Sequence, residues 1–268
     1  TIWGGEFLLT DASSFKRVAT IREFSLPGGA QAVKEPRRTS LGLLYEIFGD
    51  ALFDLKELAP VAAFSDSERS ILRHMLSKGI NAPRTTSMGR LFDAVASITN
   101  LRQRVSFEGQ AAMELEFAIL DERINDSYEY LPYEYLIEPA VKGGESLLVV
   151  DWAPLIAGVI HDVISGKQIS YMSQRFHNTV VEILVDVARR VGEERVILTG
   201  GCFQSRYLTA RAVERLTREG FRPYWHQRVP PNDGGIALGQ VFAALNALRR
   251  RTDSDEATVS LQSENVLQ

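Results

Sequence analysis

The sequence predicts an α/β fold, in which short apolar strands and amphipathic helices follow one another along the chain. Its clearest unit runs from Arg195 to Gly239, with an apolar strand, a glycine turn, a helix, a second short strand and a second glycine turn. Residues 1–26 alternate between apolar and polar side chains, which predicts a β meander. Residues 39–101 instead have helical periodicity, interrupted near Pro60 and Gly79. Both kinds of element are therefore expected in one core.

Gly200-Gly201 is the first glycine turn of this unit. It follows the apolar run Val196–Leu198 and precedes an amphipathic helical pattern around residues 208–216. Phosphate oxygens can approach such a turn closely, because glycine has no Cβ and the start of a helix carries a partial positive charge. Glycine also serves ordinary strand-to-helix turns, so the pair alone leaves a phosphate site and a simple turn equally open.

The second glycine turn lies at residues 232–235 and reads Asn-Asp-Gly-Gly. Pro230-Pro231 holds the chain extended before it, and the helical run IALGQVFAALNALRR follows it. From the residues alone, Asp233 is favoured as the cap of that helix. The alternative is a carboxylate that points toward a metal or a nucleotide phosphate, because hard cations bind oxygen ligands.

Composition excludes several classes of protein. The 268 residues are 45% hydrophobic and 24% charged, and 30 basic against 34 acidic residues give a net charge of −4, so we expect no nucleic-acid partner. The single Cys202 excludes an internal disulfide framework. No membrane span or signal peptide is recognisable, which predicts a cytoplasmic protein without a membrane partner. Because Thr1 opens directly on a turn between two strands, we expect a segment of a longer protein.

Polar residues at three places in and just before the helical region are candidates for a capping or binding role. Ser65 to Glu68 resembles a capping box at the start of a helix. Asp93 is the single acid of the segment MGRLFDAVASITNL, and it either faces solvent or pairs with hydroxyl groups of a ligand. Arg37-Arg38, with Lys34, either meets an anionic substrate or, as the favoured reading, is a solvated helix start.

The second half of the chain continues the alternation. We expect a strand and loop at a sheet edge in residues 121–145, a buried strand at residues 147–150, and helices from Pro154 and from Ile169. No two histidines have the i, i+4 spacing that places two imidazoles on one helix face, and nucleophile-elbow, P-loop and C-x-x-C motifs are absent from the sequence. These absences argue against serine hydrolases, Walker NTPases and zinc ribbons.

Seven ordered segments together resemble the C-terminal, TsaD-like segment of HypF, the carbamoyltransferase family that matures [NiFe] hydrogenases. This resemblance covers Thr1 to about Leu248 and implies the actin/sugar-kinase/Hsp70-type ATPase fold, truncated at its N-terminus. The seven segments are TIWGGEFLL, LPGGAQAVKEPRR, GRLFDAVASI, SFEGQAAMELE, RFHNTVVEIL, LTGGCFQSRYL and VPPNDGGIALGQ.

The resemblance also implies an activity. The family uses carbamoyl phosphate and ATP to make carbamoyl-adenylate, and this part passes the carbamoyl group to the C-terminal cysteine of a HypE-like acceptor protein. The product is a precursor of the cyanide ligands of hydrogenase. Such an acyl transfer requires stabilisation of an oxyanion and of the leaving phosphate. The residues do not identify catalytic side chains.

Carried over by position, the nucleotide contacts begin in the first half of the chain. Gly4 and Gly5 match the first phosphate-loop glycines of the family. Asp93 matches the acid that contacts the ribose hydroxyls, and Gly109 matches the glycine of the next nucleotide-contacting turn. All four are therefore expected around one nucleotide.

The remaining matched positions lie in the unit at residues 195–239. Gly200 and Gly201 match the glycine pair beneath the nucleotide, and Ser205 replaces the usual Asn, which weakens or reroutes a purine contact. Asp233 matches an aspartate that binds a metal in the family. The resemblance therefore favours the role of metal ligand over the role of helix cap for Asp233. The family's other ligands, a histidine cluster and a second aspartate, lie upstream of Thr1, so we expect a divalent metal, Zn or Fe, in the intact protein and little or none in this chain.

The predicted organisation has three parts. Residues 1–150 form the remainder of a first α/β subdomain with a helical insertion, residues 151–251 form a second α/β subdomain with the nucleotide loop, and residues 252–268 form a mobile tail. Two other functions stay open: transfer of a carbamoyl group to a small-molecule hydroxyl, and a non-catalytic nucleotide-binding docking module.

Overall fold

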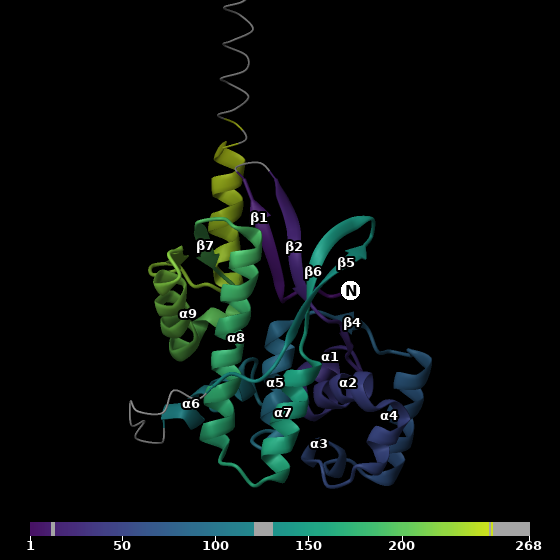
Figure 1. Ribbon diagram of the computed structural model, residues 1–268. Coiled ribbons are helices and arrows are strands. Elements are labelled where there is room, and N and C mark those ends of the chain that lie inside the picture. The colour runs from purple at the N-terminus through teal and green to yellow at the C-terminus, as the bar shows by residue number, and fades with distance from the viewer. Residues whose placement is uncertain (12–13, 121–130, 247, 249–268) are drawn as a thin grey trace, which may run out of the picture.

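The computed structural model describes residues 1–11, 14–120, 131–246 and 248. Strands gather toward one end of the molecule, α1 to α5 and α7 gather toward the other, and the long α8 runs beside both (Figure 1). The strands are β1 (Glu6–Thr10), β2 (Phe15–Ile21), β3 (Phe24–Ser25), β4 (Arg84–Thr85), β5 (Leu136–Lys142), β6 (Glu145–Asp151), β7 (Arg195–Leu198) and β8 (Arg222–Trp225). The helices are α1 (Ala30–Lys34), α2 (Pro36–Phe48), α3 (Ala59–Ala62), α4 (Asp66–Lys78), α5 (Met88–Ile98), α6 (Gln110–Leu120), α7 (Ala153–Ile164), α8 (Ile169–Val191) and α9 (Arg206–Arg218), with 3-10 turns η1 (Gly49–Asp54), η2 (Gly201–Gln204) and η3 (Asp233–Gly235).

The larger sheet has the strand order β1-β2-β6-β5. β1 and β2 form the antiparallel hairpin expected from residues 1–26, and β2 pairs in parallel with β6, Thr20 opposite Val149. β5 returns along β6 through a two-residue turn, where Gly143 and Gly144 both have positive φ, as a tight hairpin requires. The predicted edge strand is confirmed, and Pro139 is compatible with that edge. Residues 121–130 of the expected loop lie outside the described part.

The helical region begins and ends largely where local signals predict. α4 has a complete capping box between Ser65 and Glu68, and it ends at Gly79 in the left-handed conformation. α2 crosses β3 closely at Gly42, where an added Cβ would collide with the carbonyl oxygen of Ser25. Among the helices that the structure describes, none is both long and apolar enough to cross a membrane.

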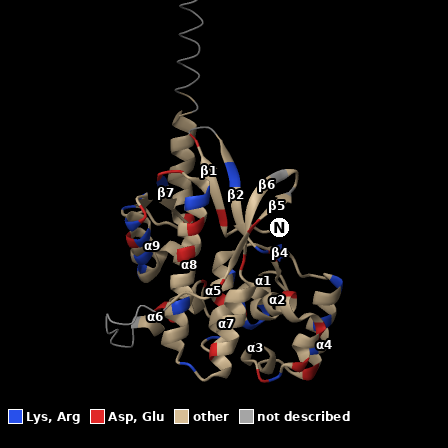
Figure 2. Ribbon diagram, viewed as in Figure 1, with Lys and Arg blue, Asp and Glu red and all other residues tan. Residues whose placement is uncertain are grey.

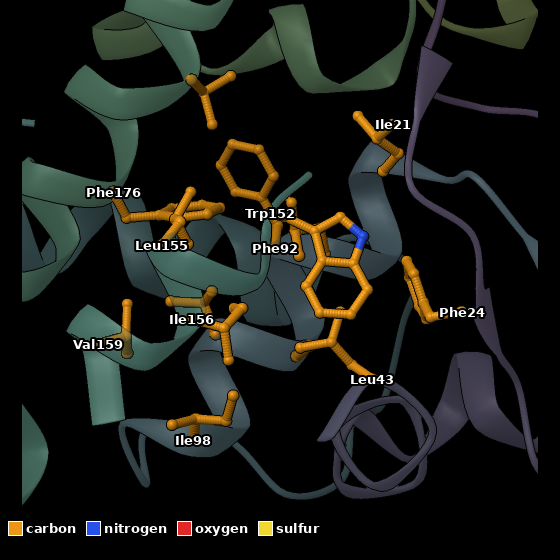
Figure 3. Close-up of a cluster of buried hydrophobic side chains, with 14 of the residues drawn as sticks. Ile21, Phe24, Leu43, Phe92, Ile98, Trp152, Leu155, Ile156, Val159 and Phe176 are labelled. Atoms are coloured by element: carbon orange, nitrogen blue, oxygen red, sulfur yellow. The ribbon is translucent and has the colours of Figure 1, made fainter. Parts of the chain in front are cut away.

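One cluster of buried side chains holds the helices together (Figure 3). Trp152 is fully buried, packs edge-on against Phe24 and donates its indole N–H to the carbonyl oxygen of Arg22 at 2.6 Å. Phe92 of α5 packs edge-on against Phe176 of α8, with ring centroids 4.8 Å apart. The cluster fixes α5 between segments on both sides of residue 150, so the subdomain division at that residue stays a prediction.

The smaller sheet consists of β7 and β8, which are parallel and joined through α9. Leu198 lies opposite Trp225 at the carboxyl ends of the two strands. The first glycine turn follows β7 closely, and the second follows β8 after residues 226–231. Figure 2 shows basic and acidic residues at positions along both α8 and α9. Arg215 of α9 binds Glu182 of α8 through two hydrogen bonds of 2.6 and 2.9 Å, which ties this unit to the core helices. The unit therefore has a fixed position relative to α8.

Candidate functional site

The first half of α5 is the centre of the candidate site. Ser87 caps the helix, and its hydroxyl oxygen accepts the backbone N–H of Arg90 at 3.3 Å. Arg90 and Asp93 are one helical turn apart and face each other, with Nη1 2.7 Å from Oδ2. Asp93 is only 3% exposed. The solvent-facing alternative for Asp93 is therefore wrong.

Burial dominates the electrostatics of Asp93. Desolvation raises the pKa of this carboxyl group to about 6, although the charge of Arg90 opposes the shift and the charge of Glu108 adds to it. Neither Arg90 Nη1 nor Asp93 Oδ2 has a hydrogen-bond partner of normal geometry among the described residues. A buried charged pair that leaves hydrogen-bonding capacity unused is suited to a polar ligand.

The turn after β7 lies against this pair. Burial raises the pKa of the Cys202 thiol to about 11, and the charges of Arg90 and Asp93 also act on it, in opposite directions. Cys202 belongs to η2, so the Gly200-Gly201 turn and α5 are neighbours. Burial therefore favours the protonated thiol of Cys202 over the thiolate.

The turn after β8 joins the same group. The backbone N–H of Gly200 donates to the carbonyl oxygen of Pro231 at 2.8 Å. Asn232 accepts the N–H of Gly234 at 3.1 Å and caps η3, while Asp233 is exposed and has no side-chain partner among the described residues. Asn232 therefore caps η3, and Asp233 lies inside η3, before the helical residues that begin at Ile236. No described hydrogen bond of the Asp233 side chain supports its interpretation as a cap. Its role as a metal ligand stays a prediction.

The described residues do not form a metal site. They contain no group of three His, Cys, Asp or Glu side chains placed to hold an ion. Asp233 alone offers one exposed carboxylate, which is too few ligands for tight binding of Zn or Fe. No chemical step is therefore assigned to a metal here.

The Gly4-Gly5 turn packs on the start of α5. Gly4 accepts the backbone N–H of Met88 through its carbonyl oxygen at 3.0 Å. A Cβ at Gly5 would collide with the carbonyl oxygen of Thr86. The N–H groups of both glycines donate to the carboxylate of Glu6. Their expected phosphate contact stays a prediction.

Gly109 and Ser205 flank the site and have local structural roles. Gly109 has φ +81° and precedes α6, and its neighbour Glu108 is the residue whose charge acts on Asp93. Ser205 accepts the N–H of Leu208 at 3.1 Å and caps α9. An Asn at this position would cap the helix equally well. The nucleotide contacts of Gly109 and Ser205 stay predictions.

The basic segment around Arg37 is a structural feature. Arg37 is 4% exposed, donates its Nε–H to Glu35 at 2.9 Å and lies 4.0 Å above the ring of Phe64. The favoured interpretation, a solvated helix start, is therefore wrong for Arg37. Its guanidinium pairs with Glu35 and packs over Phe64.

Sequence reasoning missed several residues of the site. Arg90 is detectable from its i, i+3 spacing to Asp93, and Asn232 from its preference for caps. His226 follows β8, and its Nε2 lies 3.0 Å from the Thr199 hydroxyl after β7. That contact depends on strand pairing, which no local pattern contains.

Fold and site together define the class of the protein: an α/β domain in which glycine turns lie near a buried pair of one acidic and one basic side chain. Comparison with known proteins refines the class. Residues 1–240 match the family model described as "Carbamoyltransferase, Kae1-like Domain, second subdomain". The chain belongs to this carbamoyltransferase family, and the resemblance to HypF is confirmed.

Relatives and solved structures agree with this assignment. Carbamoyltransferase HypF of Synechocystis sp. is 37% identical over 259 residues, which cover 92% of this chain and 32% of that protein. A carbamoyltransferase HypF homolog of Cupriavidus necator is 28% identical over 254 residues, with 91% and 61% covered. The crystal structure of full-length HypF in its phosphate- and nucleotide-bound form is 36% identical, with a TM-score of 0.79 over 92% of this chain and 31% of that one. The chain thus spans about a third of most of these relatives, and its expected fold is confirmed.

Proposed function

We propose that this chain supplies part of the nucleotide site of a carbamoyltransferase. The donor is carbamoyl-adenylate, made from carbamoyl phosphate and ATP, and the acceptor is the C-terminal cysteine of a HypE-like protein on the route to hydrogenase cyanide ligands. The observation that carries the proposal is the buried pair of Arg90 and Asp93 beside the Gly200-Gly201 turn. The cytoplasm, a reducing compartment, suits a free thiol acceptor.

Asp93 is proposed to hold the ribose. With a pKa of about 6, its carboxyl group is mostly ionised at neutral pH and accepts hydrogen bonds from two neighbouring hydroxyl groups. Because the site is desolvated, such charge-assisted bonds are stronger than they are in water. Gly109, Gly200, Gly201 and Ser205 are proposed to contact the rest of the nucleotide through the turns that adjoin this pair.

Arg90 is proposed to neutralise the leaving phosphate. The acceptor sulfur attacks the carbamoyl carbon, the bond from that carbon to the phosphate oxygen breaks, AMP leaves and the thiol proton passes to solvent. Negative charge grows on the phosphate during this step, and a fixed guanidinium beside it lowers the barrier. The carbamoyl group ends as a thiocarbamate on the acceptor.

Calorimetry with AMP and adenosine tests the nucleotide site. We expect Asp93→Asn to weaken both ligands at least tenfold, while Arg90→Gln weakens AMP more than adenosine, because adenosine has no phosphate. Glu138→Gln, on the exposed edge strand β5, is the matched control and should bind as the wild type does. Binding of AMP that is indifferent to Asp93, or absent in the wild type, would contradict the proposal.

A further inference from the structure

A carboxylate of the chain itself occupies the Gly4-Gly5 turn. Oε2 of Glu6 accepts the backbone N–H groups of Gly4 at 2.6 Å and of Gly5 at 2.9 Å. Oε1 accepts the hydroxyl of Thr20 at 3.2 Å and also the hydroxyl of Thr86. Four donors from three separate segments therefore converge on one anion.

The donors have the character of a built anion site. Two successive backbone N–H groups that point at one oxygen form a nest, a common way of binding phosphate. Thr20 and Thr86 are both fully buried, so their hydroxyl groups have fixed surroundings. The turn itself is held by the bond from Met88 to Gly4. The carboxylate of Glu6 thus occupies the place that oxygens of a phosphate group would take.

We propose that Glu6 is an internal occupant of this anion site, and that the Gly4-Gly5 turn binds a ligand phosphate only by exchange with Glu6. The identity of that phosphate, as part of a nucleotide or of carbamoyl phosphate, rests on the proposed function. Both anions cannot share the same donors, since two like charges in contact repel each other. Glu6 therefore competes with a ligand phosphate for the same donors, so its removal should strengthen phosphate binding.

The position of Glu6 permits the exchange. It is the first residue of β1, at the edge of the larger sheet, and its side chain is half-buried. Rotation of the side chain toward solvent therefore leaves the strand pairing and the core in place. The threonine hydroxyls and the two N–H groups stay where they are and become available to the ligand.

Titration of the 268-residue chain with inorganic phosphate tests this exchange, with 15N-glycine labelling to follow Gly4 and Gly5 by NMR. We expect Glu6→Ala to bind phosphate at least tenfold more tightly than the wild type, with shifts of both glycine amides. Glu6→Gln keeps the shape of the side chain and removes its charge, so we expect an affinity for phosphate between those of the wild type and Glu6→Ala. Glu138→Ala removes an exposed carboxylate elsewhere and should match the wild type.

Unchanged or weaker phosphate binding in Glu6→Ala, or a gain without shifts at Gly4 and Gly5, would overturn the proposal. If thermal melts show that Glu6→Ala is not folded, the same measurements on Glu6→Gln test the proposal, and unchanged or weaker phosphate binding by that variant would overturn it. Failure of the proposed function is distinguishable, because AMP binding depends on Asp93 whereas this titration uses phosphate alone and observes the glycine turn.

Discussion

The backbone N–H of Gly200 donates to the carbonyl oxygen of Pro231 across 2.8 Å. This bond joins the turn after β7 to the turn after β8 at the carboxyl ends of two parallel strands, where ligands commonly bind in α/β proteins. The contact between Thr199 and His226 is a second link between the same strand ends. The two glycine turns are therefore coupled, and a substitution that distorts one turn should also alter the conformation of the other.

Gly200→Ala should damage this unit through backbone conformation alone. Gly200 has φ +107° and ψ 161°, a region that essentially only glycine adopts, and forcing another residue there costs about 1–3 kcal/mol. Nothing lies within 4 Å of the added Cβ, so a steric clash is not the cause. We expect a lower melting temperature and weaker AMP binding. Gly201→Ala is the control, because its φ is not positive and its surroundings are also open; equal effects of both changes would refute this explanation.

Gly42→Ala should disrupt the packing of α2 on β3. The added methyl group would overlap the carbonyl oxygen of Ser25, so the two elements must separate, at a cost of about 3 kcal/mol or more in the free energy of unfolding. Gly89→Ala, in the first turn of α5, has only the Ser87 hydroxyl nearby at 3.8 Å and should stabilise the helix by up to about 1 kcal/mol. Urea denaturation measures the free energy of unfolding of both variants. If Gly42→Ala is as stable as the wild type, α2 and β3 are not packed as closely at Gly42 as the structure indicates.

Asp93→Asn should stabilise the protein while it weakens nucleotide binding. The folded pKa, about 6, lies above the unfolded value of 3.8, so the stability linked to protonated Asp93 is complete below about pH 4 and is lost as pH rises through 6. The shift of about two pKa units corresponds to about 3 kcal/mol at pH 7.5. Asn cannot ionise, so the variant does not lose this stability as pH rises. The free energy of unfolding of Asp93→Asn should therefore exceed that of the wild type at pH 7.5, and the difference should vanish near pH 4.

The measurement is a series of urea denaturation curves from pH 4 to pH 8. Asp162→Asn provides a contrast, because Asp162 is equally buried but hydrogen-bonds Tyr133 and pairs with Arg175; this change should destabilise the protein at pH 7.5. A destabilised Asp93→Asn protein at that pH would mean that Arg90 compensates for the buried charge fully.

His177 should cause an acid-sensitive loss of stability. Its ring is fully buried, donates Nδ1–H to the Ser173 carbonyl oxygen at 2.8 Å, and has a pKa lowered to about 4 by desolvation. A lowered folded pKa gives stability that is complete above pH 6.5 and is lost as pH falls toward 4, about 3 kcal/mol in total. His177→Phe keeps the aromatic contacts with Phe92 and Tyr207, and it should flatten the pH dependence of unfolding in this range. An unchanged slope would assign the acid sensitivity to other groups.

Much of the fold follows from local patterns. The capping box at Ser65, the glycine stop at Gly79 and the strand–turn–helix unit at residues 195–239 all depend on residues that are close in sequence, so their chemistry can be recognised there. The resemblance of the ordered motifs predicts that Asp93 and the glycine turns contact a nucleotide, and this role stays a prediction. Residues 252–268, expected as a tail, lie outside the described part of the chain.

The sequence by itself determined which elements form and which glycines lie at turns, because helix caps, periodicity and the absence of a Cβ are properties of neighbouring residues. Only the tertiary structure decided that Arg90 pairs with a buried Asp93, that Asn232 and not Asp233 caps its turn, and that Glu6 occupies the Gly4-Gly5 donors. These outcomes depend on desolvation and on donors brought together from distant segments, and neither is contained in a local pattern.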